Sequence, residues 1–183
     1  MPVVCESCGS RRAVPRSIEG VDLLECELCG ALQGDDAAVA LAEERREARE
    51  RGYDPAVFPL VRALETVPTF HVGGVEAGRP ERSEYPFVFL RIDEGGLVHL
   101  ERLLTSLEMA NRETKRRWVV EATLQRGLLF VLRPRFWKLV SQITAEDIEE
   151  ARADLAVLGR VLARDVRLPW WGLTPRDPTL DLL

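Results

Sequence analysis

The sequence lacks several features that would place it in a broad class of protein. None of its apolar runs approaches the roughly 18 residues that a membrane-spanning helix needs, so no membrane partner is expected. Its first residues contain neither a basic region nor an apolar one, which predicts no secretory signal and favours the cytoplasm. Lysine accounts for only two of the 25 basic residues, a bias that we attribute to genome composition.

Sequence motifs of enzymes are lacking as well. The chain contains no HExxH, P-loop or GxSxG pattern. Its two histidines, His71 and His99, have no further residue that would complete a set of nucleophile, base and orienting group. We therefore expect a protein without a catalytic site.

The composition is that of a globular protein, with 46% hydrophobic and 30% charged residues in a chain of 183. This length predicts one ordinary domain, with at most a small appendage. The net charge is -5, but residues 109–143 hold eight basic residues against two acidic ones. An acidic whole argues against a general nucleic-acid coat protein, whereas the local basic block is compatible with a confined anionic partner.

All four cysteines lie near the amino terminus, at Cys5, Cys8, Cys26 and Cys29. Two Cys-x2-Cys pairs separated by seventeen residues are typical of a zinc site, because each pair can direct two sulfurs at one metal ion. A glycine follows each pair, and we expect a positive φ there that turns backbone N–H groups toward the sulfurs. Four thiolates leave no open position for a substrate, so the predicted Zn²⁺ is structural. Iron is the less favoured metal, and a redox-active pair is a further alternative.

Residues 1–34, with their CESCG and CELCG halves, resemble a zinc ribbon. The resemblance covers about a fifth of the chain. Within this part, residues 21–25 are predicted to form a short strand that leads to the second cysteine pair. Zinc ribbons occur in transcription factors, ribosomal proteins, polymerase subunits and enzymes. The resemblance therefore implies a bound metal but no particular function.

After the ribbon, apolar periodicity and turn residues predict an α+β fold, with a small antiparallel sheet covered on one face by helices. We divide the chain into a zinc ribbon (1–34), a helical linker (35–66), an α+β domain (67–167) and an irregular tail (168–183). The charged first helix is expected to be a solvated stem between the ribbon and the main domain, and a charged surface for a partner is the alternative. The expected elements are helices over 37–51 and from residue 54, strands over 69–72 and 86–92, a helix over 97–113, a hairpin of strands 117–124 and 128–136, and a helix from Thr144.

The hairpin segment 112–138 combines basic and aromatic side chains, as single-strand nucleic-acid binders do. The alternative is an ordinary sheet in which Trp118 and Phe130 point into the core, while one of Phe136 and Trp137 points away from it. The candidate polyanion-binding residues are Arg116, Arg117, Arg126, Arg133, Arg135 and Lys138.

The tail carries Trp170 and Trp171, which are costly to leave in water. They are predicted either to cover an edge of their own domain or to bind a partner or a second copy. From these features we expect a non-catalytic zinc-ribbon adaptor or accessory protein that mediates protein–protein interaction. The alternative is a nucleic-acid-binding protein that uses the ribbon and the basic hairpin. An enzyme with a structural ribbon is the third hypothesis.

Overall fold

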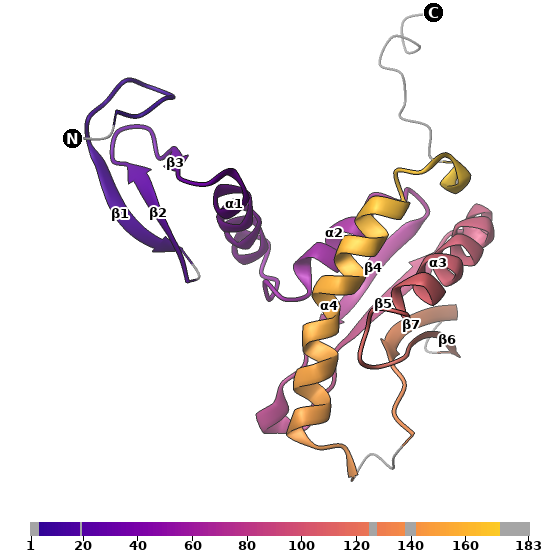
Figure 1. Cartoon of the computed structure of the whole chain (residues 1–183). Helices are drawn as coiled ribbons and strands as arrows, with labels where there is room; N and C mark the ends of the chain where they lie inside the picture. The colour runs from indigo at the N-terminus through magenta and orange to yellow at the C-terminus, as the bar shows by residue number, and fades with distance from the viewer. Residues whose placement is uncertain (1–3, 19, 125–127, 138–141, 173–183) are drawn as a thin grey trace, which may run out of the picture. The chain divides into compact units, whose positions relative to one another are not determined.

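A computed structural model of the chain describes residues 4–18, 20–124, 128–137 and 142–172. The chain forms two compact units, Met1–Pro55 and Ala56–Leu183 (Figure 1). The boundary falls within the predicted linker 35–66, so its two helices belong to different units. None of the described helices has the length and apolar character needed to cross a membrane.

The amino-terminal unit contains a three-stranded antiparallel sheet in the order β1-β2-β3. The sequence predicted only the middle strand, over Val21–Glu25. The first strand was missed because its residues are largely polar, and it is defined instead by pairing along its whole length with β2. The strands are β1 (Ala13–Ile18), β2 (Val21–Cys26) and β3 (Leu32–Gln33).

Helix α1 (Asp36–Glu50) packs against this sheet, which corrects the expectation of a solvated stem. The carboxylate of Asp35 caps the helix by accepting from the N–H groups of its first turn. Ala42 and Ala48 are fully buried, and such small side chains are easily overlooked between charged ones. Arg46 lies 3.5 Å from the carboxylate of Glu25 on β2 and so adds an ionic contact between helix and sheet.

The carboxy-terminal unit confirms the predicted α+β class. Its four-stranded sheet is antiparallel throughout, in the order β4-β5-β7-β6. Helices α2, α3 and α4 lie on one face of the sheet (Figure 1). The elements are α2 (Phe58–Glu65), β4 (Phe70–Glu76), η1 (Pro80–Arg82), β5 (Phe87–Ile92), η2 (Glu94–Gly96), α3 (Leu97–Ala110), β6 (Trp118–Leu124), β7 (Leu128–Pro134), α4 (Ala145–Asp165) and η4 (Pro169–Trp171).

The core lies between the sheet and these helices. Trp118 and Phe130 point into it, as predicted, and both are buried. Helices α2 and α4 pack closely at Gly159, where a Cβ atom would lie 2.7 Å from the Cβ of Pro59 and 2.9 Å from the N of Leu60. A larger residue at Gly159 would therefore separate the two helices.

Two predicted boundaries are resolved by the structure. Helix α2 begins late, at Phe58, so that Pro59 occupies its first turn, where the missing N–H has no cost. Strand β4 does not end at Gly73-Gly74, as the sequence suggested, but continues to Glu76. A register shift between Val72 and Val75 absorbs the glycines, as a β-bulge does.

Helix α4 fixes the start of β6 through one buried carboxylate. Asp154 accepts from the backbone N–H groups of Lys115 and Arg116, each at 2.8 Å, and from the indole N–H of Trp118 at 3.3 Å. Asn111, at the end of α3, donates from its side-chain amide to the carbonyl of Trp118 and accepts from the N–H of Trp118. The connection from α3 to β6 is thus held at both of its ends.

We predict that Asp154→Ala lowers the free energy of unfolding by about 3 kcal/mol, because three N–H donors lose their acceptor in a buried place. Urea denaturation followed by circular dichroism measures this change. Glu149→Ala, at an exposed position of the same helix, is the control and is expected to change little. A loss below about 1 kcal/mol for Asp154→Ala would contradict the assigned role.

Candidate metal centre and contact surfaces

The four cysteines of the amino-terminal unit meet in one cluster, with their sulfur atoms all within 4.8 Å of one another. The Sγ atoms of Cys5 and Cys29 lie 3.7 Å apart, and those of Cys8 and Cys26 lie 3.6 Å apart. Four sulfurs bound tetrahedrally at about 2.3 Å from one ion are separated by about 3.8 Å. The cluster therefore has the dimensions of a four-coordinate metal site.

The two halves of the cluster have the same backbone geometry. The N–H of Cys5 donates to the carbonyl of Ser10, and the N–H of Cys26 donates to the carbonyl of Ala31, five residues later in each case. Gly9 and Gly30 both adopt φ 72°, which confirms the positive φ expected after each pair. Each half supplies one buried cysteine, Cys5 or Cys26, and one exposed cysteine.

Backbone N–H groups favour the thiolate form that binds metal. The N–H of Cys8 lowers the pKa of Cys5, and the N–H of Cys29 is the largest influence that lowers the pKa of Cys26 to about 6. The N–H of Ser10 lowers the pKa of Cys8 in the same way, but Cys29 and burial together raise it to about 12. The cluster thus divides into low-pKa and high-pKa thiols, and a bound cation would favour the thiolate form of all four.

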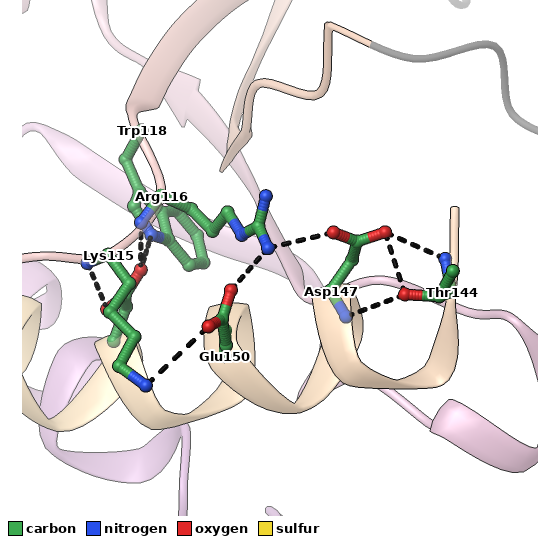
Figure 2. Close-up of polar contacts among 7 residues, drawn as sticks. Lys115, Arg116, Trp118, Thr144, Asp147 and Glu150 are labelled. Atoms are coloured by element: carbon green, nitrogen blue, oxygen red, sulfur yellow. Dashed lines mark hydrogen bonds and ion pairs between the residues drawn. The ribbon is translucent and has the colours of Figure 1, made fainter. Parts of the chain in front are cut away.

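Ion pairs within the carboxy-terminal unit neutralise most of the described arginines of the predicted polyanion surface. Arg116 lies between Asp147, at 2.8 Å, and Glu150 (Figure 2). Arg117 lies 2.7 Å from a carboxylate oxygen of Glu108. Arg133 of β7 is paired with Glu121 of β6, at 2.6 Å. Arg126 and Lys138 lie outside the described residues.

Arg135 differs from these arginines, because it forms no ion pair with any described residue. Its guanidinium lies 4.3 Å from the ring centroid of Trp137, which is 78% exposed. Both residues line a cavity of about 150 Å³, together with Lys115, Arg116, Arg117 and Phe136. Binding of a polyanion at this surface stays a prediction, with Arg135 as its unpaired charge.

The two tail tryptophans have different environments. Trp171 is fully buried, and its ring stacks on His99 at an interplanar angle of 11°. Its carbonyl accepts a hydrogen bond from Arg102 of α3. Trp170 is 39% exposed. The start of the tail thus covers its own domain, and Trp170 is the member of the pair placed where a partner can reach it.

The histidines each have one polar partner. His71 lies 2.8 Å from a carboxylate oxygen of Asp93, and His99 lies 2.8 Å from the hydroxyl oxygen of Thr69. Burial, and to a lesser extent Arg102, lower the pKa of His99. Within the described ranges, neither histidine belongs to a complete set of nucleophile, base and orienting group.

The sequence analysis missed an apolar surface on the sheet of the carboxy-terminal unit. Along β5, Val88 and Leu90 are fully buried and face the helices, whereas Phe87 and Phe89 alternate with them and point to the other side. This second side, the open face, has no described helix packed on it (Figure 1). The signal was present in the sequence, since residues 86–90 are apolar at both alternating sets of positions. We define the open-face patch by its half-buried apolar residues, Phe87, Phe89, Val119, Leu129 and Val131.

Comparison of the chain with family models, with curated proteins and with solved structures finds no match.

We predict that Cys26→Ser weakens metal binding and unfolds the amino-terminal unit, because that unit is too small to be stable without the ion. Proton NMR of the full chain in excess metal should show loss of the amide signals of residues 4–34 while signals of the carboxy-terminal unit remain. Ser10→Ala is the matched control, since only the backbone of Ser10 bonds a cysteine of the cluster. Unchanged spectra and metal content in Cys26→Ser would contradict a four-cysteine site.

Proposed function

We propose that this chain is a non-catalytic adaptor or accessory protein. Its amino-terminal unit binds one structural Zn²⁺ in the manner of a zinc ribbon, and the sheet of its carboxy-terminal unit contacts a protein. The open-face patch is the observation that supports the protein contact most directly. The metal holds the first unit in shape and takes no part in a reaction, because four protein ligands leave no coordination position free.

Zinc is favoured over iron by the spacing of the two cysteine pairs. Cys-x2-Cys pairs separated by fifteen to twenty residues are typical of zinc sites. The distances between the sulfurs fit a tetrahedral site, which is the geometry that Zn²⁺ adopts in structural sites. An iron centre of the rubredoxin type uses the same ligands, so the metal content must be measured.

Metal analysis of protein purified under reducing conditions is expected to give about one zinc per chain, because the four thiolates complete one tetrahedral site. Cys26→Ser should contain much less than the unaltered protein. Iron at this stoichiometry, with the visible absorption of a ferric thiolate centre, would replace the zinc assignment. If the reduced protein contains no metal, both the zinc and the iron assignments are wrong.

The protein contact is supported by the two-sided apolar character of the central strands. An antiparallel sheet that meets water on one face alternates apolar and polar residues, whereas strands buried on both faces are continuously apolar. Strand β5 begins Phe-Val-Phe-Leu and strand β7 begins Leu-Leu-Phe-Val-Leu, so both have the second pattern. An apolar patch of this kind on an uncovered face is typical of a protein-binding surface.

Nucleic-acid binding is the less favoured function on grounds of charge. Three of the predicted arginines are already paired with carboxylates of their own unit. The amino-terminal unit, Met1–Pro55, carries 12 acidic residues against 7 basic ones. Four thiolates on one divalent cation would make it more negative still. A phosphate backbone would be repelled by such a unit.

We expect a photo-crosslinking amino acid at position 89 to capture a protein in living cells, because Phe89 lies at the centre of the open-face patch. The same amino acid at position 104 is the control, since Leu104 is an exposed apolar residue of α3, on the helical side of the unit. Gel electrophoresis and mass spectrometry identify the product. Capture of the same proteins from both positions, or of none from position 89, would contradict a contact through the open face.

A further inference from the structure

We infer that the open-face patch is covered by a second copy of this chain, so that the protein is a homodimer joined sheet to sheet. The inference rests on the proposed function, because it names the occupant of the same face. The patch is centred on β5 and β7, the two inner strands of the sheet. A two-fold axis through the centre of a patch uses the same residues twice, which is the arrangement of most homodimers.

The register of the strands defines the centre of the patch. Phe89 of β5 is directly opposite Val131 of β7, which is opposite Glu121 of β6. The rings of Phe87 and Phe89 are in contact, with centroids 4.9 Å apart. The apolar part of the patch is therefore centred on β5 and β7, whereas on β6 Val119 is opposite the charged Arg133 and Glu121 is opposite Val131. Its aromatic and branched side chains are of the kind that packs between sheets.

The charges of the carboxy-terminal unit favour a copy of itself over a strongly charged partner. Residues 56–183 contain 18 basic and 18 acidic residues, so two such units have no net repulsion. The border of the patch carries both signs. Arg91 forms no ion pair within the described part of the chain, and Glu121 is held by Arg133 through one carboxylate oxygen, Oε2.

An axis parallel to the strands and between β5 and β7 makes these groups complementary. It places Phe89 of one copy opposite Val131 of the second copy, across the roughly 10 Å that separates packed sheets. The same axis brings the second carboxylate oxygen of Glu121 toward Arg91 of the second copy. This arginine lies one strand and two residues away from the position directly opposite Glu121. Each copy contributes one residue of each type to both contacts, so each contact occurs twice across the two-fold axis and no further copy is needed.

Sedimentation equilibrium of the zinc-loaded full chain tests the dimer. The expected mass is twice the protomer mass of 20.6 kDa at high concentration, with dissociation on dilution. Phe89→Glu and Val131→Lys, each alone, should weaken dimerisation by about tenfold or more, because each would bury a charge against an apolar residue. Leu104→Glu, at an exposed position of α3, is the control and should leave the mass unchanged.

Mixing Phe89→Glu protein with Val131→Lys protein tests the axis itself. In the mixed dimer one contact is the native phenylalanine–valine pair and the other is a glutamate–lysine pair, so the two variants should associate although neither does alone. Circular dichroism and thermal unfolding show that each variant is folded. Association of the mixture, but not of its components, supports the inference.

Two outcomes would overturn the second copy as occupant. One is an unaltered protein that remains a monomer at every concentration, and the other is a dimer that Phe89→Glu does not dissociate. If the protein is a monomer and position 89 crosslinks a different protein in cells, the proposed function holds and the occupant is that protein. If it is a monomer and position 89 crosslinks nothing, both proposals fail.

Discussion

The buried carboxylate of Asp154 is the interaction on which the arrangement of the carboxy-terminal unit depends most. It joins the longest helix to the segment that begins β6, by accepting from two backbone N–H groups and from the indole of Trp118. Arg116, in the same segment, then reaches Asp147 and Glu150 on the same helix (Figure 2). The start of β6 is thereby fixed to α4, and β6 in turn pairs with β7 along seven positions. The attachment therefore also fixes the outer edge of the sheet relative to the helices that cover its other face.

The same contacts explain why Arg116, in a segment with a strongly basic sequence, is not a free positive charge. Arg116 and its acceptors are separated by 31 and 34 residues in the chain and meet because Asp154 holds the segment before β6 against α4. Side chains paired in this way have little freedom to reorganise around a phosphate backbone. A partly buried ion pair fixes the positions of its two side chains but adds little attraction for a phosphate outside the pair. Arg135 differs, because its guanidinium lies over the exposed ring of Trp137 and forms no ion pair with a described residue.

Local patterns were predictable from the sequence and distant pairings were not. The cysteine knuckles, the capping box at Thr144 and the hairpin of β6 and β7 each depend on residues within a few positions of one another, and the structure has all three. Strand β4 was predicted to end at its glycines, because a bulge is visible only when the partner strand is known. The burial of Trp171 depends on His99 and Arg102, some seventy residues earlier. The open-face patch required knowing which face the helices cover.

A metal ion bound by the four cysteines would give the two units of this chain different determinants of stability. Packing of α2, α3 and α4 on a sheet makes the carboxy-terminal unit respond chiefly to temperature and to changes in its core. A unit folded around an ion responds to supply of that ion, by about 1.4 kcal/mol for each tenfold change in free concentration. An unfolded amino-terminal segment is also where a protease would begin to degrade the chain. The cellular abundance of this protein would therefore follow the metal status of the cell, even though the cysteine cluster lies in a different unit from the proposed contact surface.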